Sequence, residues 1–325
     1  MTTWNKNPII VDLSHYNTFD MSLAKGIVDL VICKCGEMTP GRPENQQYDY
    51  SFAPFIQAAQ DNGIAAGAYI YLSPDYYILG QLTGGLDAYK NKARSDNLEY
   101  QLLRKWIAGK GIYCLMFDME KQWINATPAQ GRIPSNWIMA NLDLMYKHVK
   151  EGQAAKEIPD VPLILYTSEQ YGKAACVIGG VNMLETWIAK HPDVKLMSAT
   201  WIAPAVFCKW SEIRQYFPKD TQFPPYINSP SMPWFWQFSA GGGIKPGTDY
   251  VNGVLTYRET DLSCCAVDKD TLYKWLKYSQ VTPPTPPEPP TPPVPPVSTL
   301  EARIKVLEDE VALITGKMEL IKAIL

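Results

Sequence analysis

The sequence has no excess of basic residues, no long apolar run and a polar beginning, and each absence excludes a class of partner. Its 325 residues carry 30 Lys and Arg against 33 Asp and Glu, which gives a formal net charge of -3. Nucleic acid is therefore not an expected partner, because binding it requires a basic surface. No run of about 18 apolar residues occurs, so we expect no membrane insertion. Residues 1–7 are polar and lead directly into a strand, which predicts synthesis in the cytoplasm without a signal peptide.

Patterns that bind metals are also scarce. The seven cysteines form no Cys-x-x-Cys pair, and the three histidines are His15, His148 and His191. We therefore expect neither a metal nor a cofactor. The cysteines are predicted to be buried, reduced thiols. With 46% hydrophobic residues, the chain can still bury a large core.

The most informative stretch present is Cys114–Glu120, an apolar run that ends in two acids, Asp118 and Glu120. Side chains at positions i and i+2 of a strand leave on the same face, so the two carboxyl groups are expected to emerge together. Two adjacent carboxylates cannot both ionise at low cost, so one pKa should rise while the other stays low. Acid-catalysed cleavage of a glycosidic bond needs this combination. The alternative is an ordinary strand end with two solvated acids.

Strands alternate with helices over residues 1–280, and this spacing predicts an α/β fold with a TIM-like (β/α) barrel. Several of the expected strands end in a polar or acidic residue at the edge where such barrels keep their chemistry. The expected strands are residues 9–14, 29–34, 65–72, 114–120, 163–167, 200–203 and 234–238. The expected helices are residues 22–26, 52–62, 136–151 and 181–190, with residues 73–110 largely helical.

Two different segments follow the predicted barrel domain. Residues 281–297 contain ten prolines, which favours a semi-rigid polyproline spacer over a ligand for a proline-recognising domain. Residues 298–325 open with a capping box, Ser298 with Glu301, and carry an unbroken heptad pattern. We predict that this helix forms a coiled coil with copies of itself, giving a homo-oligomer; the alternative is that it folds back onto the barrel. The apolar heptad positions are Leu300, Ile304, Leu307, Val311, Ile314, Met318, Ile321 and Leu325.

Seven short motifs occur in one order along residues 8–265, and the chain that carries them resembles the glycoside hydrolase family 25 muramidases, lysozymes common in bacteriophages and bacteria. It departs from the family pattern at Asn17, where the family has Gln, and at Ile70, where it has His. The motifs are Val11-Asp12-Leu13-Ser14-His15-Tyr16, Lys34-Cys35-Gly36-Glu37, Gly67-Ala68-Tyr69, Phe117-Asp118-Met119-Glu120, Leu165-Tyr166-Thr167-Ser168, Trp201-Ile202-Ala203, and Trp236-Gln237-Phe238-Ser239 followed by Asp261-Leu262.

The resemblance implies a flattened, irregular barrel that cleaves the β-1,4 bond between N-acetylmuramic acid and N-acetylglucosamine in bacterial peptidoglycan. It assigns Glu120 as the proton donor and Asp118 as the nucleophile or the group that orients the substrate's acetamide. Asp12 and Asp261 complete the catalytic acids. The expected substrate-binding residues are Tyr69, Tyr71, Tyr166, Trp201, Trp236, Glu37 and Gln237.

A phage enzyme of lysis or of the virion, acting on the bacterial cell wall, is consistent with these features. Two rival interpretations stay open at this point. One is a barrel that binds cell-wall glycan without cleaving it, as a structural component of a virion. The other is a related barrel that hydrolyses a chitin-like glycan.

Overall fold

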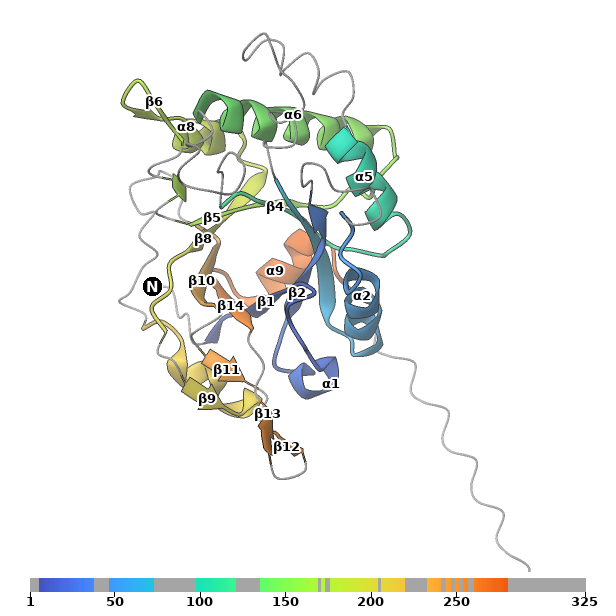
Figure 1. The fold of residues 1–325 in the computed structure, drawn as a ribbon, viewed down its shortest axis with the longest axis vertical. Helices are drawn as coiled ribbons and strands as arrows, with labels where there is room; N and C mark the ends of the chain where they lie inside the picture. The colour runs from blue at the N-terminus through green and yellow to red at the C-terminus, as the bar shows by residue number, and fades with distance from the viewer. Residues whose placement is uncertain are drawn as a thin grey trace, which may run out of the picture. The chain divides into compact units, whose positions relative to one another are not determined.

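Eight strands close into a barrel in the computed structural model of the chain (Figure 1). The structure describes residues 6–37, 47–72, 98–120, 135–168, 171–172, 176–203, 206–219, 233–240, 244–246, 249–251, 254–256 and 260–279. Around the barrel the strands are, in order, β1 (Ile9–Leu13), β14 (Asp261–Cys265), β10 (Phe235–Ser239), β8 (Val194–Ala199), β5 (Leu163–Ser168), β4 (Leu115–Asp118), β3 (Ala65–Tyr71) and β2 (Leu30–Glu37).

The barrel is parallel except at β14, which is antiparallel to both of its neighbours, β1 and β10. The predicted α/β barrel is therefore confirmed, and β14 is its one departure from the all-parallel sheet of a TIM barrel. The chain leaves β10 and re-enters at β14 from the same end of the barrel, and an antiparallel strand needs no crossover helix to do so. As a result, the first residue of β14 lies at the mouth where the parallel strands end.

Most of the described helices lie outside the ring of strands, and α1, α8 and α9 begin with side-chain caps. Asn182 begins one of them by accepting hydrogen bonds from the backbone N–H groups of Leu184 and Glu185 at 3.0 and 3.2 Å. The helices are α1 (Met21–Ala24), α2 (Phe52–Asp61), α5 (Leu98–Ile107), α6 (Ser135–Ala154), α8 (Met183–Lys190), α9 (Lys269–Leu276) and the 3₁₀ helix η5 (Trp210–Tyr216). Three small two-stranded pairs complete the described elements: β6 (Val177–Ile178) with β7 (Val181–Asn182), β9 (Val206–Cys208) with β11 (Ile244–Pro246), and β12 (Asp249–Val251) with β13 (Val254–Thr256).

Two apolar clusters follow from the alternation of side chains along the barrel strands. On β1, Val11 belongs to an outer cluster between the strands and the helices, whereas its neighbour Ile10 belongs to an inner cluster that fills the barrel. Leu272 and Leu276 of α9 join the inner cluster, and α9 is seen through the ring in Figure 1. Because α9 follows the far end of β14, it closes the end of the barrel opposite to Asp261.

The structure corrects one predicted strand and adds elements that were not predicted. The predicted strand at residues 200–203 is wrong, because β8 ends at Ala199 and the next residues have no regular structure. Trp201 and Ile202 are apolar but exposed, so an apolar run at the barrel rim was mistaken for a buried strand. Strands β8 and β14 and helix α9 were not predicted. The predicted linker and coiled coil, residues 281–325, lie outside the described residues and stay predictions.

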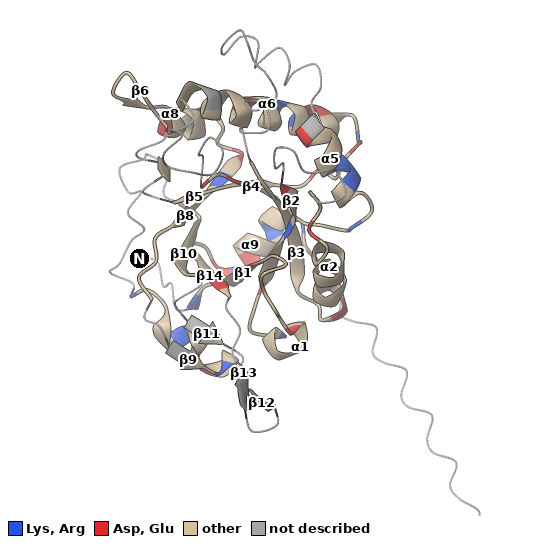
Figure 2. Cartoon of the chain, viewed as in Figure 1, with Lys and Arg blue, Asp and Glu red and all other residues tan. Residues whose placement is uncertain are grey.

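The distribution of charged residues and the lengths of the helices complete the description of the fold. Lys and Arg are interspersed with Asp and Glu over the described part of the chain (Figure 2). No helix within the described ranges is long and apolar enough to cross a membrane.

Candidate active site

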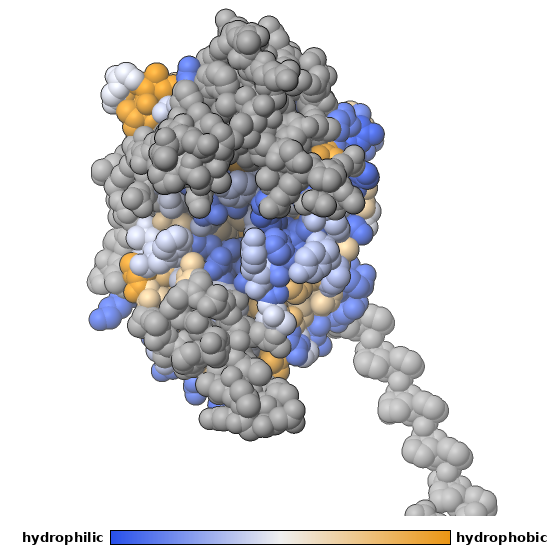
Figure 3. Space-filling model, in the orientation of Figure 1, coloured by the Kyte–Doolittle hydropathy of each residue, from blue (hydrophilic) through white to orange (hydrophobic). Residues whose placement is uncertain are grey.

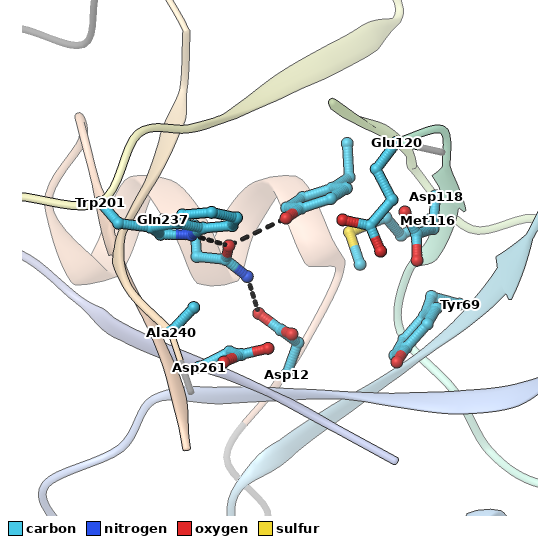
Figure 4. Close-up of a pocket in the computed structure, with 10 residues that line it drawn as sticks. Asp12, Tyr69, Met116, Asp118, Glu120, Trp201, Gln237, Ala240 and Asp261 are labelled. Carbon is cyan, nitrogen blue, oxygen red and sulfur yellow. Dashed lines mark hydrogen bonds between the residues drawn. The ribbon is translucent and has the colours of Figure 1, made fainter. Parts of the chain in front are cut away.

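Four acidic side chains from three strands line one pocket at the end of the barrel (Figure 4). Asp12 lies on β1, Asp261 on β14 and Asp118 on β4, and Glu120 follows β4 by two residues. The pocket has a volume of about 370 Å³, part of it open to solvent. Residues more than a hundred positions apart in the sequence are thus brought to one opening.

Alternation along the strands explains why these side chains point inward. Asp12 and Asp118 lie two residues beyond Ile10 and Met116, both of which belong to the inner cluster. Each acid therefore continues the inward face of its strand at the last position before the mouth. The carboxyl ends of parallel strands meet at this mouth, which is where α/β barrels carry their functional groups.

Asp12 and Asp261 form the first acidic pair. They are directly opposite each other in the register of β1 and β14. Burial raises the pKa of Asp12 well above its ordinary value, and the neighbouring Asp261 carboxyl raises it further, while a hydrogen bond from the Gln237 amide opposes the shift. Two facing carboxylates repel each other, so the pair favours the state in which one member is protonated.

Asp118 and Glu120 form the second pair. Asp118 is 6% exposed, and its buried Oδ1 has no hydrogen-bond partner among the described residues. Burial raises the pKa of Asp118 well above its ordinary value, the Glu120 carboxyl adds to this, and the positive charge of Lys34 opposes it. Lys34 is itself buried, on the inward face of β2. Sequence analysis did not assign Lys34 a role, although a lysine in an apolar strand signals a buried partner.

One amide joins three of the site's side chains. Gln237 donates from Nε2 to Asp12 Oδ2 at 2.9 Å, and its Oε1 accepts from Tyr166 Oη and Trp201 Nε1, both at 2.9 Å. Figure 4 shows these contacts as dashed lines. The orientation of the amide is fixed by the two donors on its oxygen, so its N–H group is directed at Asp12. Gln237 is therefore a positioning residue for the Asp12 carboxyl.

The wall of the pocket is aromatic and apolar. Tyr69 and Tyr166 line it from β3 and β5, and burial raises the pKa of both phenols well above the usual range, so they remain neutral. Trp201 lies at the rim with 60% of its surface exposed while its indole N–H stays bound to Gln237. Met116 and Ala240 also line the pocket and were not predicted.

Three of the predicted substrate-binding residues do not line the pocket. The prediction for Trp236 is wrong: it is 1% exposed, belongs to the outer cluster, and donates from Nε1 to the carbonyl oxygen of Thr200. Tyr71 and Glu37 lie beside Lys34 instead. Lys34 Nζ pairs with the Glu37 carboxylate and sits 5.5 Å from the centre of the Tyr71 ring.

Fold and pocket together define an α/β barrel whose strand ends present paired carboxyl groups against an aromatic wall. Within the described part of the chain, no group of three or more His, Cys, Asp or Glu side chains is arranged to hold a metal ion. The site's own chemistry is that of carboxylic acids, a buried ammonium group and hydrogen-bonding amide and phenol groups.

Comparison with known proteins gives only distant structural similarity. No protein-family model matches the chain, and no curated protein sequence matches it. A glycosyl hydrolase 25 of Streptococcus pneumoniae is similar over 84% of this chain and 93% of its own, with 8% identity and a TM-score of 0.49. A chitinase from Chromobacterium violaceum is similar over 78% of this chain and 85% of its own (12% identity, TM-score 0.35). Xylanase B from Clostridium stercorarium is similar over 62% and 66% (13% identity, TM-score 0.37). Similarities this low leave the activity to be inferred from the site itself.

Proposed function

We propose that the chain is a glycoside hydrolase that cleaves the β-1,4 bond between N-acetylmuramic acid and N-acetylglucosamine in peptidoglycan. The observation that carries this proposal is the convergence of Asp12, Asp118, Glu120 and Asp261 on one pocket beside Tyr69, Tyr166 and Trp201. Hydrolysis of a glycoside needs one protonated carboxyl group and one carboxylate on the two sides of the bond. Aromatic faces suit the apolar faces of sugar rings.

The pair formed by Asp118 and Glu120 supplies both forms of the carboxyl group. Because burial and the neighbouring charge disfavour ionisation of Asp118, the pair retains a proton at a pH where isolated acids have lost theirs. In the proposed reaction Glu120 gives a proton to the glycosidic oxygen as the C–O bond breaks. Asp118, whose carboxylate form is favoured by the charge of Lys34, stabilises the positive charge that develops on the sugar. Water then adds to the anomeric carbon and returns a proton to Glu120. The raised pKa of Asp118 also supports the reverse assignment, in which Asp118 keeps the proton and Glu120 is the carboxylate.

An activated substrate separates the two assignments. We expect Glu120→Gln to lower the rate of cell-wall clearing by about 10²- to 10⁴-fold, the usual contribution of a general acid. The dinitrophenolate group of a dinitrophenyl glycoside leaves without being protonated. The same variant should therefore retain most of its rate on that substrate. Asp118→Asn should lose activity on both. The opposite pattern would assign the proton to Asp118.

The matched control is Glu151→Gln, which makes the same chemical change on the exposed surface of α6 and should leave both rates unchanged. Equal clearing of walls by the wild-type protein and Glu120→Gln would contradict the catalytic assignment. Wall binding without clearing by either protein would favour a glycan-binding protein without catalysis.

Product analysis tests the substrate. After digestion of peptidoglycan, the new reducing ends are reduced and identified by mass spectrometry. Muramic acid at these ends is expected for the proposed bond, and glucosamine at these ends would contradict it. Preferential cleavage of chitin oligosaccharides would favour the chitin-type alternative.

We also propose that residues 298–325 hold several copies of the chain together. The heptad pattern of this segment supports the proposal. An oligomer would present several pockets to one polymeric substrate.

A further inference from the structure

Three aromatic rings outside the acidic pocket form a second cluster. The ring of His15 lies 3.9 Å from that of Tyr16 and 5.7 Å from that of Tyr50, measured between ring centres, with tilts of 41° and 44°. Tyr16 is 81% exposed and Tyr50 is 71% exposed. Large aromatic side chains gathered at one place with open faces are typical of a contact surface.

The turn that carries Tyr16 is held in place by its own hydrogen bonds. Asn17 Oδ1 accepts from the backbone N–H of Ser14 at 2.7 Å, and the Asn17 N–H donates to the Ser14 carbonyl oxygen at 2.9 Å. The backbone that carries the Tyr16 ring therefore does not have to be ordered by a ligand. A surface fixed in advance binds with a smaller entropic cost.

A buried carboxylate fixes the histidine between the two tyrosines. Asp49 Oδ2 accepts from both the backbone N–H of His15 and its ring Nδ1, at 3.0 and 2.8 Å, and the Asp49 side chain is 1% exposed. The backbone N–H of Ser51 donates to Oδ1 of the same carboxylate at 2.9 Å. Because Nδ1 is engaged by Asp49, Nε2 is the ring nitrogen left for a ligand. No described residue is hydrogen-bonded to Nε2.

This cluster lies at the same mouth as the acidic pocket. His15 follows Asp12 by three residues at the end of β1. The segment that carries Tyr50 is attached to the end of β2, where the Asp49 N–H donates to the Cys35 carbonyl oxygen at 3.1 Å and Tyr48 bridges Gly36. Strands β1 and β2 are parallel neighbours, so both chain segments leave the barrel at its functional end.

We propose that Tyr16, His15 and Tyr50 form an outer subsite that binds a pyranose ring of the glycan chain beyond the acidic pocket. The sugar ring places its C–H face on the tyrosine rings, and one of its hydroxyl groups forms a hydrogen bond with His15 Nε2. This inference rests on the proposed function for the identity of the ligand as a glycan. It adds a requirement for chain length, because only a chain that extends past the pocket reaches the subsite.

The test measures binding in the Glu120→Gln background, so that the ligand is consumed only slowly. The probes are peptide-free glycan strands of peptidoglycan, from disaccharide to octasaccharide, titrated by calorimetry. Adding Tyr16→Ala and Tyr50→Ala together should weaken octasaccharide binding about tenfold, a loss typical of a residue that contributes strongly to an interface. The loss should become smaller as the strand is shortened. Tyr16→Phe and Tyr50→Phe keep the ring faces and should restore the affinity.

The control is Val181→Ala, which removes exposed apolar surface at the β6–β7 hairpin, the orange patch at the upper left of Figure 3. It should bind every strand as its parent does. Unchanged octasaccharide binding by the double tyrosine variant, or an equal loss at every length, would overturn the outer subsite. If the wild-type protein cleaves no wall but the tyrosine variant still loses affinity for long strands, the proposed hydrolase fails and the subsite stands.

Discussion

Two buried aspartates lower the stability of the folded protein at neutral pH. The pKa values of Asp12 and Asp118 are raised mainly because burial disfavours their charged forms. Between about pH 4, where an aspartate of the unfolded chain titrates, and these raised pKa values, the folded protein binds more protons than the unfolded one. Stability therefore decreases as the pH rises through this window. The site keeps acids that the fold alone would not favour.

Asp118→Asn tests this cost directly. An amide occupies nearly the same space without a charge, so the variant should be more stable than the wild-type protein at pH 7, by roughly 1 kcal/mol or more, since one pKa unit corresponds to about 1.4 kcal/mol. Below about pH 4 both side chains are neutral and the difference should disappear. Urea denaturation across this pH range measures it. Hydrolysis is lost at every pH.

The comparison variant is Asp61→Asn on α2, where the carboxylate is exposed. Its stability should follow that of the wild-type protein across the same range. If Asp118→Asn proves less stable than the wild-type protein at pH 7, the attraction of Lys34 outweighs the cost of burial and our account of the pocket is wrong.

Neighbouring residues on β10 show how far the sequence predicts the site. Gln237 and Trp236 were both expected to contact substrate, but adjacent strand residues point to opposite faces. Gln237 contacts Asp12 inside the barrel, and Trp236 packs in the outer cluster. The alternation rule that placed Asp118 and Glu120 on one face also shows that Gln237 and Trp236 cannot both face the pocket. Which face is inward depends on the partner strands, and the sequence does not show them.

At the scale of the element, β3 and β4 approach closely because one residue lacks a side chain. Gly67 belongs to the inward face of β3, and a Cβ atom built there would lie 2.3 Å from Cys114 Sγ and 3.2 Å from the Cys114 carbonyl oxygen. Gly67→Ala should therefore destabilise the barrel by about 1–3 kcal/mol, the usual cost of overpacking. Thermal unfolding followed by circular dichroism measures the change.

A second substitution checks the cause. Cys114→Ala removes the sulfur, so it should recover part of the stability lost in Gly67→Ala, although it is itself mildly destabilising. The coupling free energy from the four proteins should then be favourable. Strictly additive losses would show that the contact with the sulfur is not the reason for the glycine.

The strands that could be predicted are those whose own residues are apolar. Strands β1, β2 and β5 each open with an apolar run of at least three residues, and sequence analysis placed each of them to within a few residues. Strands β8 and β14 include polar residues, of which Ser198 and Ser263 are fully buried. Their burial is provided by neighbouring strands in the closed barrel and not by their own composition. Patterns within one segment do not contain that information.

At the scale of the whole molecule, the heptad segment predicts how the pocket meets its substrate. Under the proposed function a single pocket holds a short stretch of glycan, whereas a cell wall offers many equivalent stretches close together. If several barrels share one bundle, binding of the first raises the effective concentration of the others at the wall. The gain is avidity and requires no new contact at the pocket.

Deleting residues 298–325 should convert an oligomer into a monomer in light scattering and weaken adsorption to walls, with little change in the rate on a short soluble glycan. A sharper variant is Val311→Lys, which places a charge at an a position of the predicted seam and should give the same result. Asp309→Lys introduces the same residue at the outward f position and should leave the oligomer intact. An unchanged mass for the deletion would exclude this segment as the oligomerisation element. Because the short-substrate rate depends only on one barrel, its persistence in the monomer would separate assembly from catalysis.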